Sequence, residues 1–282
     1  MLARVPASTA NLGPGFDVLA IALALYLEVE ITPASSFSML STGEGSGMYD
    51  GPDHIAAVTA REVLGHDGFH LRVHSEIPLA RGLGSSAAIV LAAAAAAGAS
   101  SPAEYACRFD GHAENAVASW LGGLVATWED GEELTIVRPG LDASWKFVVA
   151  IPDVNLDTER ARSVLPAQVP YADAINNLGR LLPLVQGLGD HREMKPTLMH
   201  DNLHQPYRSA LLPFAQPVLD AMVGAGAHGA CWSGAGSSLL GITTDAHVGA
   251  VVAGAEVTLR EHQIPGRVLV LEADRDGLSV RP

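Results

Sequence analysis

Lysine and cysteine are both scarce in this sequence of 282 residues. The two cysteines, Cys107 and Cys231, are too few for a disulfide framework and lack metal-ligand spacing, which favours a reduced, cytoplasmic setting. The two lysines, Lys146 and Lys195, belong to no GxxxxGK[ST] pattern, so the chain is not a P-loop protein. A formal net charge of −14 argues against a nucleic-acid partner, whose phosphates would be repelled.

A membrane-spanning or export segment is not expected either. Val18 to Leu27 is a run of ten residues without a charge, and a helix needs about 20 residues to cross a bilayer. It lies between Asp17 and Glu28 with only Arg4 before it, so it lacks the basic leader of an export signal. We therefore predict a buried strand here and a soluble protein without a membrane partner.

The hydrophobic fraction of 48% and the charged fraction of 17% describe a globular chain. Its first half predicts mixed α and β structure. The predicted strands are 2–7, 18–31, 36–41 and 69–77, the predicted helices are 53–65, 85–97 and 102–119, and the predicted hairpin joins 124–128 to 133–138.

Arg138-Pro139-Gly140 is a predicted boundary between two α+β lobes, 1–140 and 141–282. The second lobe predicts a strand at 146–151, a helical region at 157–224, strands at 229–232 and 238–243, a helix at 245–261 and a strand at 267–271. This order is typical of a split β-α-β, ferredoxin-like layer. A cleft between the lobes is the expected ligand site.

Residues 77–97, IPLARGLGSSAAIVLAAAAAA, join a glycine-rich turn to an alanine-rich helix. The first amides of a helix have no intrahelical partner, and a glycine turn lets another molecule approach them, so an anion site is one interpretation. The alternative is that Gly82 and Gly84 only shape a turn. A third glycine at Rossmann spacing is absent.

Five other stretches carry candidate polar groups or glycines. PASTANLGPGFD (6–17) presents Asn11 and Asp17 from a turn, where they either bind the local backbone or recognise a polar small molecule. In 104–123, the residues Glu104, His112 and Asn115 are spaced by eight and three and would share a face of the predicted helix, although Glu104 also fits a capping box with Ser101. Arg162 and Arg208 follow in DTERARSVLP and DNLHQPYR, and SGAGSS (233–238) is a second glycine-rich loop.

Three of these motifs, PASTANLGPGFD, PLARGLGSSAA (78–88) and SGAGSS, occur in the order seen in the GHMP kinases, a superfamily of small-molecule kinases that the chain resembles along its whole length. Within it, ANLGPGFDVLAIAL, GHAENAV, ARSVLP and HQPYR are similar to the homoserine kinase branch. The resemblance implies a two-lobed GHMP kinase fold, with an amino-terminal lobe like domain 2 of ribosomal protein S5 and a ferredoxin-like carboxyl-terminal lobe.

The resemblance also implies roles for particular residues. Ser86 and Glu104 would lie near a magnesium ion, and Asn115, Asp17 and Arg162 would be the catalytic group. The expected substrate-binding residues are Asn11, Asp17, His112, Asn115, Arg162 and Arg208. The expected ATP-phosphate loop comprises Pro78, Leu79, Ala80, Arg81, Gly82, Leu83, Gly84, Ser85, Ser86, Ala87 and Ala88.

The implied reaction is ATP-dependent phosphorylation of the side-chain hydroxyl of L-homoserine to O-phospho-L-homoserine, a step of threonine biosynthesis. The alternatives are a GHMP-type kinase for another hydroxylated substrate, or a non-catalytic nucleotide-binding sensor of this fold. The resemblance allows a homodimer, although no feature of the sequence requires one. Three residues depart from the branch's usual pattern, namely Glu114, Gln205 and Ser237, where aspartate, glutamate and proline are more usual.

Overall fold

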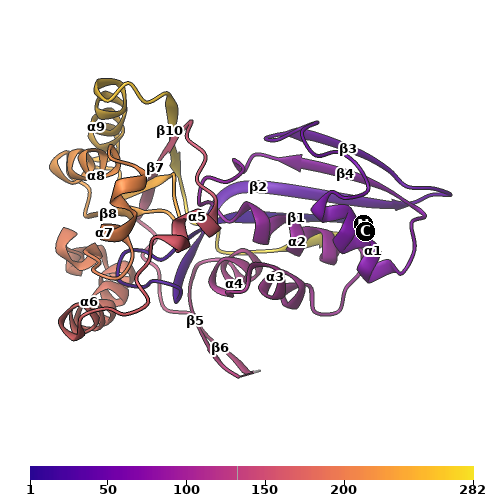
Figure 1. The fold of residues 1–282 in the computed structure, drawn as a ribbon, viewed down its shortest axis with the longest axis horizontal. Helices are drawn as coiled ribbons and strands as arrows, with labels where there is room; N and C mark the ends of the chain where they lie inside the picture. Colours follow the sequence, from indigo (N-terminus) through magenta and orange to yellow (C-terminus); the bar gives the residue numbers. More distant parts are fainter. Residues whose placement is uncertain (132) are drawn as a thin grey trace.

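The computed structural model describes residues 1–131 and 133–282, which form two lobes side by side (Figure 1). The first lobe has a seven-stranded sheet of order β11-β1-β2-β4-β3, with β5 paired to β2 and β6 to β5. Its strands are β1 (Leu2–Ala10), β2 (Leu19–Pro33), β3 (Ser38–Gly43), β4 (Phe69–Ser75), β5 (Leu124–Asp130), β6 (Glu133–Val137) and β11 (Ser279–Arg281). Its helices are α1 (Ile55–Leu64), α2 (Ser85–Ala96), α3 (Pro102–Asp110) and α4 (Glu114–Leu121).

Helix α2 is the centre of the first lobe. It packs on β1 and β2 and is contacted by α1, α3 and α4. Every residue from Ala87 to Ala96 is buried, so the helix is enclosed on all sides. The run of alanines explains this position, because small side chains let a sheet and three helices approach the same helix closely, while alanine favours the helical conformation.

The second lobe has a four-stranded antiparallel sheet of order β10-β7-β9-β8. Its strands are β7 (Lys146–Pro152), β8 (Gly229–Trp232), β9 (Leu239–Thr243) and β10 (Gly266–Leu271), and its helices are α5 (Thr158–Ser163), α6 (Tyr171–Gly189), α7 (Gln205–Arg208), α8 (Ala215–Gly224) and α9 (Val248–Glu261). Three short 3-10 turns lie between them, η1 (His191–Glu193), η2 (Pro196–Met199) and η3 (Ser209–Leu211). In chain order the sheet reads 4-1-3-2, which confirms the ferredoxin-like prediction.

Two predictions about this architecture are wrong. The helix predicted over 102–119 is two helices, because α3 ends at Gly111, which has a left-handed φ of 71° and caps it. The predicted boundary also assigns every residue after 140 to the second lobe, whereas β11 pairs with β1 and Ala273 bridges to Leu23 in the first. Strand β11 has three residues, too short for a periodic pattern to show it.

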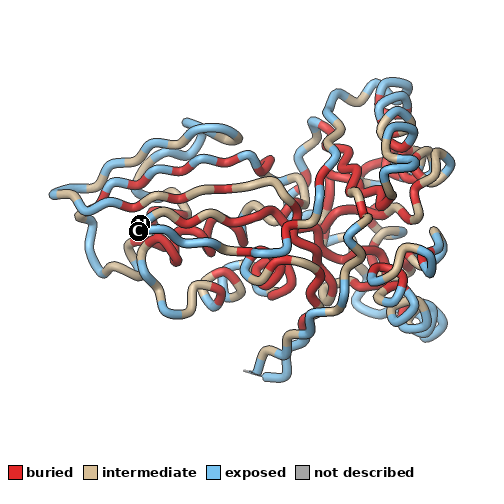
Figure 2. Tube along the Cα trace, turned by 180° about the vertical axis from the view of Figure 1, so that it is seen from behind, coloured by how far each residue is buried: buried red, intermediate tan, exposed pale blue. Residues whose placement is uncertain are grey.

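Buried positions gather around the junction of the lobes and in the sheet of the second lobe (Figure 2). The hydrophobic core runs from α2 and β1 of the first lobe to β7 and β9 of the second without interruption. The lobes are therefore held by shared apolar packing. Among the described residues, no helix is long and apolar enough to cross a membrane.

Candidate active site

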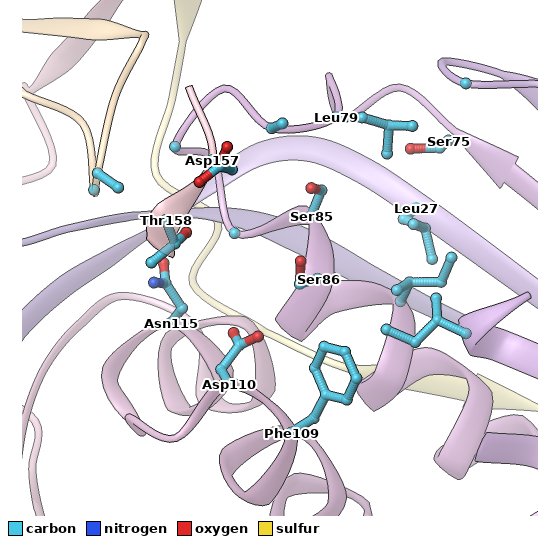
Figure 3. Close-up of a pocket in the computed structure, with 18 of the residues that line it drawn as sticks. Leu27, Ser75, Leu79, Ser85, Ser86, Phe109, Asp110, Asn115, Asp157 and Thr158 are labelled. Atoms are coloured by element: carbon cyan, nitrogen blue, oxygen red, sulfur yellow. The ribbon is translucent and has the colours of Figure 1, made fainter. Parts of the chain in front are cut away.

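A cavity of about 600 Å³ lies between the lobes (Figure 3). This volume suits a ligand of the size of a nucleotide or a drug. The six residues expected to bind a substrate all line it, and they come from both lobes: Asn11, Asp17, His112, Asn115, Arg162 and Arg208.

The glycine-rich loop forms one wall of this cavity. Of the eleven residues predicted to wrap phosphates, those that line it are Leu79, Ala80, Gly82, Gly84, Ser85 and Ser86. Pro78, Leu83, Ala87 and Ala88 are buried, and the Arg81 side chain donates to Asn155 instead of entering the cavity. Apart from Leu79, the wall therefore consists of backbone, hydroxyl groups and small side chains.

The amino end of α2 opens into the cavity. Gly84 is its N-cap, with a φ of 68° and no capping side chain. The first backbone bond of the helix runs from the Ala88 amide to the Gly84 carbonyl at 2.9 Å, so the amides of Ser85, Ser86 and Ala87 precede the intrahelical ladder. Free amides at the positive end of a helix dipole form an anion site.

The second glycine-rich loop holds the first in place. The Ser233 hydroxyl donates to the Gly82 carbonyl at 2.7 Å, and the Ser238 amide donates to the Arg81 carbonyl at 3.1 Å. From the first motif, the Asn11 amide group donates to the Gly234 carbonyl at 2.7 Å. The three motifs thus meet in one network, which links the two lobes at the cavity.

Asn115 is oriented by a buried serine. The Ser8 hydroxyl donates to Asn115 Oδ1 at 2.9 Å, and Ser8 is fully buried. This bond fixes the orientation of the amide of Asn115, which lines the cavity and whose NH₂ group is a hydrogen-bond donor. Ser8 also donates its amide to the Leu83 carbonyl, which ties Asn115 to the glycine-rich loop.

Asp17 and Arg162 form a bidentate ion pair across the lobes. The two hydrogen bonds measure 3.0 and 2.7 Å, and both side chains are about one-third exposed, at 35% and 37%. Burial alone would lower the pKa of Arg162, but the hydrogen bond and charge of Asp17 outweigh it and raise that pKa. The cavity therefore contains one paired negative and positive charge that water can reach.

Arg208 is enclosed and structurally engaged. Its guanidinium donates to the Ala161 carbonyl at 3.1 Å and to Nδ1 of His204 at 3.1 Å, and it lies over the Phe16 ring. Burial lowers the pKa of Arg208 to about 10, so it stays charged at neutral pH. His204 Nε2 donates to the Gly13 carbonyl at 3.0 Å, and this arrangement requires a neutral imidazole that accepts from Arg208.

Glu104 does not reach the cavity. It is exposed in the first turn of α3, and the Ser101 side chain makes no capping bond with that helix. The prediction that Glu104 shares a face with His112 and Asn115 assumed one continuous helix, and the break at Gly111 removes that relation. Asp110, at the end of α3, lines the cavity instead (Figure 3).

Asp110 and Ser86 face the same part of the cavity (Figure 3). Burial raises the pKa of Asp110 to about 6, against the opposing effect of His112. A carboxylate with a hydroxyl beside it supplies the oxygen ligands that Mg²⁺ prefers. The sequence contains a signal that could have indicated Asp110. This carboxylate lies two residues before His112 and directly before Gly111, a glycine that ends the helix.

The buried carboxylate of Glu114 pairs with the half-buried imidazole of His112. Their Oε1 and Nδ1 atoms lie 3.1 Å apart, and the interaction with Glu114 raises the pKa of His112. Glu114 is 1% exposed, and within the described part of the chain its Oε2 has no hydrogen-bond partner. Glu114, which stands where aspartate is more usual, therefore places a longer carboxylate in contact with His112.

The other two departures have local structural roles. The Gln205 side-chain oxygen accepts from the Trp232 amide at 2.8 Å, and the Ser237 hydroxyl donates to the Val154 carbonyl at 2.5 Å. Both side chains thus brace the strand and loop that carry the second glycine motif.

The far end of the cavity was not anticipated from the sequence. It is lined by apolar and aromatic side chains together with a few polar groups, namely Leu27, Thr42, Tyr49, His54, Val73 and Phe109. A pocket with apolar walls and a few convergent polar groups is typical of a small-molecule site. No short motif marks these residues, because they come from separate strands, loops and helices.

Comparison with known protein families finds two matching family models. The family described as GHMP kinases N terminal domain matches residues 48–123, and the family described as GHMP kinases C terminal matches residues 181–255. Homoserine kinase from Moorella thermoacetica is 42% identical over 255 residues, covering 85% of this chain and 86% of that protein. The chain belongs to the GHMP kinase family.

Other relatives and solved structures also match the chain over most of its length. Homoserine kinase from Synechococcus sp. (strain RCC307) is 37% identical, covering 99% of this chain and 95% of that protein. Among solved structures, homoserine kinase from Cytophaga hutchinsonii has a TM-score of 0.86 at 24% identity, with 100% of this chain and 97% of that chain covered. L. major mevalonate kinase has a TM-score of 0.75 at 15% identity, with 97% and 96% covered, and these two structures show the fold.

As a GHMP kinase, this chain is a phosphotransferase that uses ATP and a small-molecule substrate. The open amino end of α2 gives the physical basis for holding the phosphates.

The hydrogen bond from Ser8 to Asn115 predicts a selective loss of turnover in Ser8→Ala. Without it the Asn115 amide is free to rotate, so we expect kcat to fall about tenfold while KM for ATP changes less than about twofold. Steady-state kinetics with a coupled ADP assay measures both. Ser119→Ala is the matched control, since Ser119 is a fully buried serine on α4 whose hydroxyl has no partner among the described residues. Equal losses in both variants would contradict a positioning role for Ser8.

Because His204 is neutral in the folded protein, we expect the free energy of unfolding to fall at acid pH. Burial lowers the pKa of His204 to about 4, and an unfolded histidine titrates near 6.5. Between these values the unfolded chain binds a proton that the folded chain does not, so the free energy of unfolding falls as the pH drops from about 6.5 towards 4.

We expect His204→Gln to reduce the loss of unfolding free energy between pH 7 and pH 5 by about 1–2 kcal/mol relative to wild type. Urea unfolding at the two pH values measures it. His200→Gln, at an exposed position, is the control and should behave as wild type. The interpretation is wrong if His204→Gln and wild type lose the same stability.

Proposed function

We propose that this GHMP kinase transfers the γ-phosphate of ATP to the side-chain hydroxyl of L-homoserine, forming O-phospho-L-homoserine. The observation that carries the proposal is the Asp17–Arg162 pair in the same cavity as the phosphate loop. An amino-acid zwitterion offers an ammonium and a carboxylate. Its ammonium can pair with Asp17 and its carboxylate with Arg162, so no charge is left unpaired when the Asp17–Arg162 pair opens. A neutral sugar offers neither group.

The names of the relatives support this choice, since the proteins at 42% and 37% identity are homoserine kinases. The place of such a reaction is threonine biosynthesis in the cytoplasm. Both statements are part of the proposal and rest on the substrate being homoserine.

Asn115 is the proposed contact for the reacting hydroxyl. Ser8 holds its carbonyl oxygen, and its NH₂ group is the donor that would contact the hydroxyl in the cavity. The amides of Ser85, Ser86 and Ala87 would hold the phosphates at the amino end of α2, and Arg208 would add a fixed positive charge. Phosphoryl transfer depends mainly on positioning and charge neutralisation, so a strong general base is not required.

Ser86 and Asp110 are the residues that would hold a magnesium ion, and their oxygen atoms fit its preference. When bound, the ion neutralises charge on the phosphates. We transfer to Asp110 the role that the resemblance implied for Glu104, because of these two carboxylates Asp110 lines the cavity and Glu104 does not.

A substrate panel tests the proposed function. We expect ADP release with homoserine to exceed that with threonine, serine, mevalonate and galactose. We also expect 4-hydroxybutyrate, which lacks the ammonium, and 3-aminopropan-1-ol, which lacks the carboxylate, to lose about 10–100-fold in kcat/KM.

The variant Asp17→Asn sharpens this test. Its KM for homoserine should rise at least about tenfold, and its KM for 4-hydroxybutyrate should change much less, because only homoserine has an ammonium for Asp17. Equal effects on the two substrates would remove Asp17 from the ammonium contact. Better turnover of mevalonate or galactose would assign another GHMP substrate, and ATP binding without turnover of any alcohol would indicate a sensor.

The two candidate carboxylates are distinguished by a matched pair of variants. In Asp110→Asn the magnesium concentration for half-maximal activity should rise at least about tenfold, because a charged oxygen ligand is lost. Glu104→Gln should stay within about twofold of wild type. Titration of magnesium at saturating ATP measures both, and the reverse ranking would restore the role to Glu104.

A further inference from the structure

Three histidines gather at the end of the second-lobe sheet that lies away from the cavity. His191 comes from η1, His228 directly precedes β8 and His247 directly precedes α9. At this edge β7 and β8 begin and β9 ends, whereas the glycine loop 233–238 lies at the opposite edge. None of these three histidines is among the residues that line the cavity. We call them the histidine cluster.

The three imidazole rings lie in a row beside one tryptophan. The ring centroids of His191 and His228 are 6.5 Å apart, and those of His228 and His247 are 6.4 Å apart. The buried Trp145 ring lies 6.0 Å from the His191 ring and 5.3 Å from the His228 ring. Gly226 makes room for the His247 ring, because a β-carbon there would lie 2.8 Å from its Cγ. The fold therefore brings three imidazoles from separate segments within reach of one small ligand.

His228 has a ring nitrogen that the protein leaves unpaired. Its Nδ1 is buried, and in the part of the chain that the structure describes it has no hydrogen-bond partner. The backbone amide of His228 donates to the Ile242 carbonyl at 2.8 Å, so the residue is fixed to β9. A buried polar atom without a partner lowers stability, and a bound ion is one way in which proteins satisfy such an atom. The neighbouring rings are imidazoles too, so an ion shared among them would supply the partner.

A carboxylate orients the His191 ring. Asp142 Oδ2 lies 2.7 Å from Nδ1 of His191, and ligand atoms of Asp142, Asp190 and His191 all lie within 4.8 Å of one another. Asp142 is itself held by the amides of Ser144 and His191, each at 2.9 Å. Asp190 is paired with Arg192 at 2.6 Å, so Asp142 is the carboxylate that remains to act on His191. A carboxylate on one nitrogen of an imidazole leaves the other nitrogen, here Nε2, unprotonated and ready to bind a metal.

We propose that the histidine cluster binds one divalent transition-metal ion of the zinc class. His191, His228 and His247 are the proposed ligands, water completes the tetrahedron, and Asp142 orients His191. Imidazole nitrogen suits Zn²⁺, Ni²⁺ and Cu²⁺, whereas Mg²⁺ prefers oxygen, so this site is chemically distinct from the one proposed in the cavity.

The present spacing of the rings is close to what such an ion needs. Rings bound to one tetrahedral ion have centroids roughly 5 Å apart, so neighbouring rings of the cluster have to approach by about 1.5 Å. The His191 side chain is 38% exposed and His247 is exposed, so both can rotate towards the fixed His228. The ion would then join η1 to the starts of β8 and α9. Because it would bind the folded chain, it would also raise the melting temperature, which is a readout independent of catalysis.

Metal titration of untagged, metal-free protein tests the proposal. In excess Mg²⁺, which occupies oxygen sites, we expect calorimetric titration with Zn²⁺ to show one site per chain with a Kd in the micromolar range or below. His228→Gln should raise this Kd at least about tenfold, and Asp142→Asn about 10–100-fold, because a ligand loses its orienting partner. His262→Gln is the matched control, an exposed histidine at the other end of α9, and should bind Zn²⁺ as wild type does.

Cobalt absorption and thermal unfolding give two further readouts. Co²⁺ in place of Zn²⁺ should produce the visible bands of a four-coordinate site with nitrogen ligands, and His191→Gln should lose them. Excess Zn²⁺ should raise the Tm of wild type by several degrees and leave that of His228→Gln unchanged. Circular dichroism and the Tm of each variant without metal show whether it is folded.

No binding of Zn²⁺ to wild type in the micromolar range would overturn the proposed site. Binding that persists in both His191→Gln and His228→Gln would place the ion elsewhere, such as at Asp110 and His112 in the cavity, and would overturn it as well. These measurements involve neither ATP nor homoserine, so their outcome is distinguishable from failure of the proposed function.

Discussion

Gly82 leaves no room for a side chain, and the site depends on that constraint. A β-carbon there would lie 2.1 Å from the Ser233 carbonyl oxygen, and its φ of 72° is one that other residues rarely adopt. The two glycine-rich loops therefore meet backbone to backbone. The amino end of α2 is held against the second lobe by this contact, and Asn11, Asp17 and Asn115 are placed around it by the same hydrogen-bond network.

The second constraint is electrostatic. The protein is strongly acidic, yet the proposed ligands, ATP and an amino acid, include an anion with several charges. Neither lysine lines the cavity, and Lys146 is paired with Glu272. The protein's own attraction for phosphate would then come from the free helix amides and Arg208, which act over a short range in a partly enclosed space. This explains how a phosphate site can exist without the lysine of a P-loop.

Local signals in the sequence predicted much of this protein. The alanine run predicted α2, the glycines before it predicted an open helix start, and the order of elements predicted the ferredoxin-like lobe. The errors come from one residue and one long-range pairing. Gly111 ends α3 early, so Asp110 and not Glu104 reaches the cavity. Strand β11 is recruited by an edge of β1 about 270 residues earlier, which no local pattern encodes.

The sequence by itself determined the types of group available. These are a glycine-rich loop before a helix, the arginines Arg162 and Arg208, and an asparagine, Asn115. These are local properties of short stretches, set by backbone geometry and by the chemistry of each side chain. Only the tertiary structure decided which groups share a space. The pairing of Asp17 with Arg162 and the orientation of Asn115 by Ser8 depend on how segments 145 and 107 residues apart pack together. Such contacts form only when both lobes pack into one continuous hydrophobic core, and this packing depends on the whole chain.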